Sequence, residues 1–288
     1  MARTIAQSFR EFRANLEITD LQQSTVSTRQ QSVRKAVEDG LVVLDSFLTG
    51  SYSRHTMIAP LKEADIDIFV VLDPSYYQED GQANLLDRVK GVLRRTYPKT
   101  PDISRNGQAV TICFTDFMVD VVPGFYRQGG GYLIPNTVGH TWIATDPKKH
   151  VEIMASANRE HNGDLVPLIK MTKAWNRNIN GYFNSFHLEV LALEILGGMT
   201  ISDFSSGVRY FFDKGRNLIG KKNQDPAGYG GDVGYYLNSE PKINSAVSRF
   251  GTAYERALKA EQYERDGYTS LAVDEWRKIF GSYFPSYG

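Results

Sequence analysis

The spacing of apolar residues predicts helices first and a strand after them. Apolar side chains recur every three to four residues at Ile5, Phe9, Phe12 and Leu16, the spacing of one helix face. A second helical pattern runs toward Gly50 and carries Val26, Val33, Val37, Leu41, Leu44 and Phe47. Residues 64–72, ADIDIFVVL, are rich in β-branched side chains and alternate, and Asp73-Pro74 follows them. We therefore predict two helices and then a strand that stops at Asp73.

The remaining patterns divide the chain into two parts. A helix is predicted over residues 86–97, closed by Pro98. Two strands are predicted over 110–114 and 117–122, and Pro123-Gly124 ends the second. A loop or hairpin tip is predicted at Gly129-Gly130-Gly131. Beyond residue 148 the spacing of apolar residues is helical. Helices are predicted over 165–175, 247–257 and 271–279. Another is predicted between an N-cap at Ser185 and Gly197-Gly198, and a further one after an N-cap at Ser202. We expect an α/β lobe at 1–147, a helical lobe at 148–288 and a cleft between them.

Composition and charge restrict the classes of protein and ligand. The chain has 288 residues, 41% of them hydrophobic, and its 33 basic and 33 acidic side chains cancel. A globular protein is expected, and a long nucleic acid duplex is not expected to bind, because that needs a concentrated basic face. The single cysteine, Cys113, excludes an internal disulfide and is expected in the core. Without a signal peptide or an apolar run of ~20 residues, the protein is expected to be cytoplasmic.

Three aspartates are the candidate chemistry. Asp65 and Asp67 are two positions apart on the predicted strand, so their side chains share one face. Two neighbouring carboxylates repel each other, and a bound cation would compensate them. Asp120, on a later apolar strand, can supply a third carboxylate. Oxygen ligands favour Mg²⁺, with Mn²⁺ as an alternative, and three such groups can hold two ions for phosphoryl or nucleotidyl transfer.

The Gly50-Ser51 segment precedes this strand and is the candidate triphosphate site. Glycine permits close backbone approach, and a serine hydroxyl can bind phosphate oxygens. The competing interpretation is that Asp65 and Asp67 lie on a solvated edge strand. Phe69 and Val71 continue the same face as the aspartates, which argues against it. Asp116 lies near Asp120, but Phe117 suggests a turn there, so it is treated as non-catalytic.

The ordered combination of these motifs resembles the polymerase-β-like nucleotidyltransferases, and within them the CD-NTases, the bacterial relatives of cyclic GMP-AMP synthase. The resemblance spans nearly the whole chain and rests on the following segments: GSYSRHTMIAPLKEADIDIFVVL, AVTICFTDFMVDVVPGF, WIATDPKKH, LIKMTKAWNRN, SFHLEVLALEIL, DPAGYGGDVGYYL and WRKIFGSYFP. It implies an α+β fold with a mixed β-sheet lobe, flanking helices and a helical C-terminal lobe that closes a nucleotide cleft.

The resemblance also implies further nucleotide-binding residues. Lys173 matches the family lysine that reaches the triphosphate, and Ser185 and Phe186 match residues that contact a phosphate and a base. The glycine-rich segment 225–232, with Tyr229, is similar to family loops that line the cleft. His55 departs from the family, because many relatives carry glycine there; it is either a phosphate contact or, more commonly for such a position, an exposed loop residue.

The implied function is synthesis of a cyclic di- or trinucleotide second messenger from NTPs in anti-phage defence. The product would activate a separate effector protein, and the enzyme would be constitutively active or controlled by partner proteins rather than by duplex DNA or RNA. Two alternatives share the same site: a transferase that adds a nucleotide to RNA, protein or a small molecule, and a catalytically silent nucleotide sensor. The choice of bases, ring size and linkage depends on geometry of ~1 Å in the cleft. The terminal Gly288 is, by resemblance, a candidate conjugation site.

Overall fold

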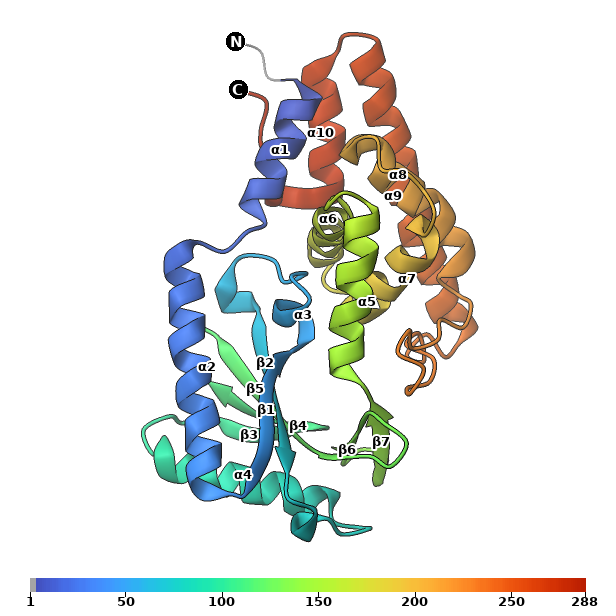
Figure 1. The fold of residues 1–288 in the computed structure, drawn as a ribbon. Coiled ribbons are helices and arrows are strands. Elements are labelled where there is room, and N and C mark those ends of the chain that lie inside the picture. The colour runs from blue at the N-terminus through green and yellow to red at the C-terminus, as the bar shows by residue number, and fades with distance from the viewer. Residues whose placement is uncertain (1–3) are drawn as a thin grey trace. The chain divides into compact units, whose positions relative to one another are not determined.

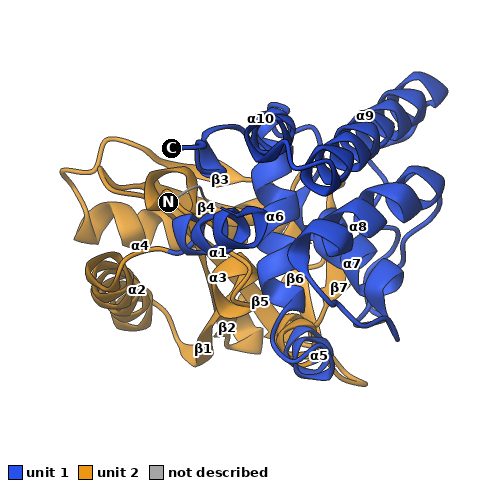
Figure 2. Ribbon diagram, turned by 90° about the horizontal axis from the view of Figure 1, so that it is seen from above, with its two compact units in different colours: residues 1–17, 153–288 blue, residues 18–152 orange. Residues whose placement is uncertain are grey.

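The computed structural model describes residues 4–288, which form two compact units. One unit comprises residues 18–152, and the other comprises residues 153–288 together with the chain before Ile18 (Figure 2). The predicted division at 147/148 placed the N-terminal helix in the first lobe, whereas the structure packs that helix within the helical unit. Where the functional lobes begin stays a prediction.

The first unit is built on a mixed β-sheet of seven strands. Its strands are β1 (Val43–Thr49), β2 (Asp65–Leu72), β3 (Ile103–Asn106), β4 (Ala109–Cys113), β5 (Met118–Tyr126), β6 (Tyr132–Asn136) and β7 (Thr141–Thr145). The spatial order is β1-β2-β5-β4-β3, and β6 joins β5 to β7 (Figure 1). Only β2 and β5 run parallel among these pairs. These two neighbouring strands carry the candidate carboxylates.

Helices cover one face of this sheet. Both α2 (Asp20–Gly40) and α4 (Gln82–Thr96) pack there, and α2 begins with a capping box between Thr19 and Gln22 (Figure 1). The alternate residues of β2 that face these helices are buried, namely Ile66, Ile68, Val70 and Leu72. The opposite face of β2 carries Phe69 and Val71 in a smaller apolar cluster. Burial on both faces fixes the register of β2, because a slip of one residue would exchange its two faces.

The second unit is helical. It contains α1 (Ile5–Asn15), α6 (Leu165–Asn178), α7 (Ser185–Leu196), α8 (Phe204–Leu218), α9 (Glu240–Arg265) and α10 (Thr269–Phe280), while α5 (Pro147–Glu160) crosses the border between the units. Phe9 of α1 contacts Trp276 and Phe284 edge to face, with ring centroids 5.0 and 5.1 Å apart. These aromatic contacts explain why the first helix belongs with the last ones, since such side chains bury large apolar areas.

Several predicted elements are confirmed, and others are corrected. The predicted strand is β2, the glycine run lies in the turn between β5 and β6, and Gly197 caps the end of α7. The helix predicted to reach Phe47 ends at Gly40, and the residues after it form β1. Pro123 does not end its strand, because β5 continues to Tyr126. The helix caps are Asn184 and Asp203 rather than Ser185 and Ser202.

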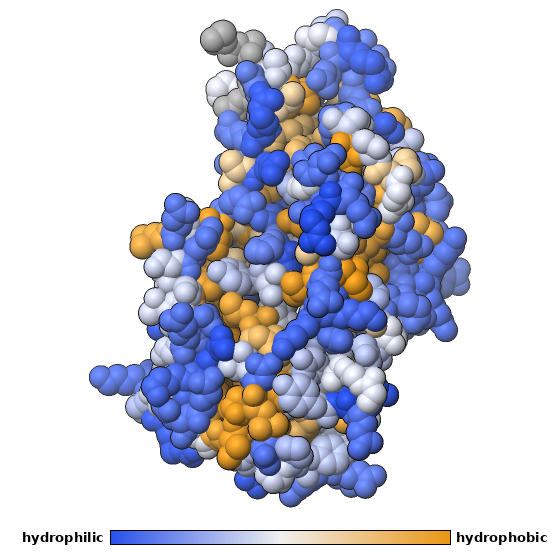
Figure 3. All heavy atoms as spheres, viewed as in Figure 1, coloured by the Kyte–Doolittle hydropathy of each residue, from blue (hydrophilic) through white to orange (hydrophobic). Residues whose placement is uncertain are grey.

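The surface seen in Figure 3 is mainly hydrophilic and carries separate apolar patches. Val42, just before β1, and Leu44, within it, are 56% and 48% exposed. Cys113 was expected in the core, but it is half-buried at the end of β4, where its thiol donates to Oδ2 of Asp102. Across residues 4–288, no helix has the length and apolar character that crossing a membrane requires.

Candidate active site

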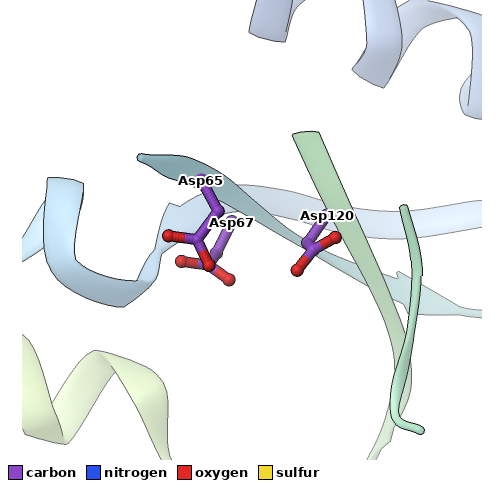
Figure 4. Close-up of side chains that lie close together, drawn as sticks. All are labelled: Asp65, Asp67 and Asp120. Carbon is purple, nitrogen blue, oxygen red and sulfur yellow. The ribbon is translucent and has the colours of Figure 1, made fainter. Parts of the chain in front are cut away.

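Two parallel strands bring the three predicted carboxylates together. Asp67 of β2 and Asp120 of β5 are direct partners in the strand register, and Asp65 is paired with Met118. Asp65 and Asp67 lie on the same face of β2, as expected from their spacing. Figure 4 shows the three carboxylates on the same side of the two strands. The third aspartate therefore reaches the first two through the pairing of strands that are distant in the sequence.

The distances suit a divalent cation. One oxygen from each of Asp65, Asp67 and Asp120 lies within 4.8 Å of the others. Mg²⁺ holds its oxygen ligands at ~2.1 Å, so two oxygens on one ion lie up to ~4.2 Å apart. Small side-chain rotations would bring this cluster onto one ion, and the same oxygens can be divided between two ions at the ~3.5–4 Å separation of two-metal sites. The donor set contains oxygen only, which fits Mg²⁺ or Mn²⁺.

The electrostatics of the cluster favour the same ligand. Burial raises the pKa of Asp120, the hydrogen bond from the Thr111 hydroxyl lowers it, and the charge of Asp65 raises it again, with a net increase. A carboxyl group in this position is an unfavourable anion when no cation is bound. A divalent cation bound beside Asp120 would lower the pKa of this carboxyl group, because its two positive charges favour the ionised form.

Gly50 and Ser51 form the turn that follows β1, beside Asp67. Thr49 is the register partner of Asp67, so the chain leaves β1 next to this carboxylate and forms the short helix α3 (Gly50–Ser53). Gly50 has a φ of 66°, and a β-carbon on it would lie 1.7 Å from Oδ2 of Asp67. The carbonyl oxygen of Ser51 accepts hydrogen bonds from the backbone N–H groups of Thr56 and Met57, at 2.9 and 3.1 Å. This turn was expected after a helix, whereas it follows a strand.

The backbone of His55 has a conformation that is strained for a residue with a β-carbon. His55 has a φ of 59°, in the left-handed region that favours glycine. Glycine at this position would adopt the same turn without strain from a β-carbon. Whether the imidazole contacts a phosphate stays a prediction.

Lys173, Ser185 and Phe186 belong to the helical unit, where Lys173 lies on α6 and the other two begin α7. The Lys173 ammonium lies 2.7 Å from Oε1 of Glu189, and the two side chains are 6% and 1% exposed. Ser185 is the exposed first residue of α7, and the N–H of the half-buried Phe186 is bound by the side chain of Asn184. A role of Lys173 at a triphosphate stays a prediction, and its ammonium would then serve Glu189 and a phosphate together, which its three donors permit.

Sequence reasoning did not single out several neighbours of these residues. The side chain of Thr111 donates to Asp120, and the hydroxyl of Tyr236 binds both the Asn184 N–H and Nδ1 of His187. The tight connection between the strands that contain Thr111 and Asp120 was a usable signal, because a short connection fixes which residues face each other. The contacts of Tyr236 have no local sequence signal. Asp116, treated as non-catalytic, pairs with Arg29 at 3.1 Å.

Comparisons with known proteins agree with this site and fold. Residues 3–158 match the sequence model of the Second Messenger Oligonucleotide or Dinucleotide Synthetase domain, SMODS. A probable cyclic nucleotide synthase of Bacillus cereus is 26% identical, over 83% of this chain and 81% of its own. A cyclic AMP-AMP-AMP synthase of an Acinetobacter species is also 26% identical, over 98% of this chain and 86% of its own.

Solved structures show the same fold at low sequence identity. The Escherichia coli protein CdnC, solved with ATP, matches with a TM-score of 0.78 at 18% identity, over 98% of this chain and 99% of that one. Apo DncV of Vibrio cholerae matches with a TM-score of 0.80 at 14% identity, over 99% and 97%. These likenesses confirm the predicted α+β polymerase-β-like nucleotidyltransferase fold. With more than half of the chain matched by one family, the protein belongs to the second messenger oligonucleotide or dinucleotide synthetases, which confirms the predicted CD-NTase membership.

Proposed function

We propose that this protein joins NTPs into a cyclic di- or trinucleotide with release of pyrophosphate, at the cluster of Asp65, Asp67 and Asp120. The observation that carries the proposal is the meeting of three carboxylate oxygens within 4.8 Å, next to the Gly50 turn, in a chain of the second messenger synthetase family. A sheet that exposes three such groups on one side has the ligands for Mg²⁺ and substrate phosphates.

Each group of residues has a distinct part in this reaction. Asp65, Asp67 and Asp120 would hold two Mg²⁺ ions, and the Gly50-Ser51 turn would hold the donor triphosphate. Bound Mg²⁺ would activate the attacking ribose hydroxyl and neutralise charge on the triphosphate and the leaving pyrophosphate. The ribose hydroxyl of one nucleotide would lose its proton to solvent, and its oxygen would bond to the α-phosphorus of another as the bond to pyrophosphate breaks. Another round in the same site closes the ring, and Lys173, Ser185 and Phe186 are the proposed contacts to phosphate and base.

The names of relatives suggest where to begin with substrates and partners. The Acinetobacter relative is a cyclic AMP-AMP-AMP synthase, and CdnC was solved with ATP and in a complex with HORMA. ATP is therefore the first substrate to test here. The proposal also includes a regulatory partner protein and a downstream effector that binds the product. The proposed biological setting is anti-phage defence.

The test is an incubation of the purified protein with all four labelled NTPs and Mg²⁺ or Mn²⁺, followed by phosphatase and mass spectrometry. We expect a phosphatase-resistant cyclic product, whose mass gives the bases and the ring size. Asp65→Ala/Asp67→Ala should abolish it. Asp116→Ala is the matched control, because Asp116 pairs with Arg29 outside the cluster, and it should keep activity. A nucleotide transferred only to added RNA, protein or a small molecule would contradict the cyclase assignment, and an output unchanged by the double substitution would favour the sensor.

A further inference from the structure

Thr111 is held directly opposite Asp120 by the sheet. The two residues are register partners in the antiparallel pair of β4 and β5. The Thr111 hydroxyl donates to Oδ1 of Asp120 with an oxygen–oxygen distance of 2.5 Å. An ionised carboxylate can only accept, so threonine is the donor, and a distance this short is typical of a hydrogen bond to a charged oxygen.

This hydrogen bond is protected from solvent. Thr111 is 7% exposed, and its strand neighbours Val110 and Ile112 are fully buried. Water therefore has little access to replace the hydroxyl if it is removed. The ladder on both sides of Asp120, to Thr111 and to Asp67, fixes the backbone of both partners. The geometry is thus built by the fold rather than by mobile side chains.

Oδ1 of Asp120 accepts this hydrogen bond, and a carboxylate offers about four lone-pair sites, so Asp120 keeps the capacity to bind a further ligand. The torsion that turns a carboxylate about its Cβ–Cγ bond has broad minima, so a carboxylate without a fixed partner can rotate. A donor on Oδ1 selects one orientation. In metal sites, such outer partners fix the ligand orientation, and their loss typically costs 10–100-fold in metal affinity.

We propose that Thr111 is a positioning residue of the metal site, whose hydroxyl orients Asp120 so that its carboxylate completes the cluster with Asp65 and Asp67. The proposal deepens the proposed function and rests on its premise that the cluster binds divalent cations. It requires no contact between Thr111 and the cation or the nucleotide.

The experiment measures Mn²⁺ binding to the full-length protein by electron paramagnetic resonance, which reports free Mn²⁺. Thr111→Val removes the donor and keeps the shape, and we expect its Mn²⁺ dissociation constant to rise about 10-fold or more. Thr111→Ser keeps a hydroxyl and should bind within about two-fold of the wild type. Thr137→Val is the matched control, because the Thr137 hydroxyl donates 2.8 Å to the Gly107 carbonyl in the same unit. It should bind Mn²⁺ like the wild type.

Three results would overturn the proposal: wild-type Mn²⁺ affinity in Thr111→Val, equal losses in the Val and Ser variants, or Mn²⁺ binding that survives Asp65→Ala/Asp67→Ala. Thermal unfolding in EDTA shows whether each variant folds, and Thr111→Ala replaces the valine variant if that one does not. Product formation is measured separately. Dependence of Mn²⁺ binding on Thr111, together with nucleotide transfer only to added RNA, protein or a small molecule, would defeat the proposed function and leave this inference standing.

Discussion

Gly50 and Asp67 lie so close that a β-carbon on Gly50 would be 1.7 Å from Oδ2 of the aspartate. Gly50→Ala must therefore displace the carboxylate or the turn. A shift of ~1 Å in a reaction controlled by positioning costs about 100-fold in rate. We expect Gly50→Ala to lose at least about that factor in product formation while retaining a folded helical unit by circular dichroism.

Gly107 supplies the control for the backbone effect. It has a similar φ of 62°, but a β-carbon there would meet nothing within 4 Å. Gly107→Ala carries the same left-handed strain without a collision, so its activity should match that of the wild type. Equal activity losses in the two variants would show that strain, not the contact with Asp67, is responsible.

Asp120→Asn should separate stability from activity. The substitution removes a half-buried charge next to Asp65, so in EDTA the free energy of unfolding should rise by about 0.5–2 kcal/mol. Activity should fall by about 100-fold or more, because the variant loses a charged ligand of an ion that contributes several kcal/mol to catalysis. Urea denaturation with EDTA and with Mg²⁺ checks the first part. A variant that is less stable than the wild type in EDTA would contradict the repulsion between these carboxylates.

His55→Gly should stabilise the turn. The left-handed backbone costs a residue with a β-carbon about 1–2 kcal/mol, and glycine loses about 0.5–1 kcal/mol through its larger unfolded-state entropy. A net gain of about 0.5–1 kcal/mol in unfolding free energy is expected in urea denaturation. His55→Ala keeps the β-carbon and should show no gain. If His55→Gly and His55→Ala both had lower activity than the wild type, the loss would be assigned to a missing contact of the imidazole.

His187 should make stability depend on pH. Burial lowers the pKa of His187 in the folded protein, against smaller opposing effects of Asp232 and Asn223, while the unfolded chain keeps a pKa near ~6.5. As pH falls through ~6.5, the unfolded state binds a proton that the folded state does not bind, so stability decreases. The difference in stability between the wild type and His187→Gln should therefore shrink between about pH 7.5 and 5.5. Parallel curves would contradict a neutral buried imidazole.

A pair of substitutions can test the proposed role of Lys173 without losing the fold. Lys173→Met alone removes the ion-pair partner of the buried Glu189, which should cost about 3–5 kcal/mol in unfolding free energy. Lys173→Met/Glu189→Leu removes both charges and should recover most of that loss. If Lys173 also binds the triphosphate, the recovered double variant should still show a raised KM for ATP. Wild-type KM in that variant would restrict Lys173 to its ion pair with Glu189.

The chemistry was predictable because it depends on local spacing and on motif order. Asp65 and Asp67 are two positions apart on a strand that the alternating pattern of residues 64–72 predicts. The apolar neighbours of Asp120 place it on another strand. The change from alternating to helical spacing predicted an α/β lobe followed by a helical lobe, and the fold class itself came from the resemblance of the ordered motifs to the polymerase-β-like nucleotidyltransferases. What the sequence could not give is the pairing itself, including the parallel match of Asp67 with Asp120.

The errors also have local physical causes. The register of β1 shifts between Val43 and Asp45, which breaks the alternation and leaves apolar residues at 41, 44 and 47, the spacing of a helix. Pro123 was interpreted as a strand end, yet it is the register partner of Val70 within the β2–β5 pair. At α7, both Asn184 and Ser185 can cap a helix, and only the hydrogen bond from the Phe186 N–H to Asn184 distinguishes them.

The parallel pairing of β2 with β5 has a consequence for how such proteins change over time. A parallel pair needs a long crossover, and here it contains α4, β3 and β4. The ladder sets which residues face each other, so loops in this crossover can gain or lose residues while Asp67 and Asp120 stay opposed. The number of residues between the second and third aspartates is therefore free to drift among descendants of one ancestor. The fold preserves only the order of the motifs. Sequence searches that require a fixed number of residues between the second and third aspartates would therefore miss true homologues.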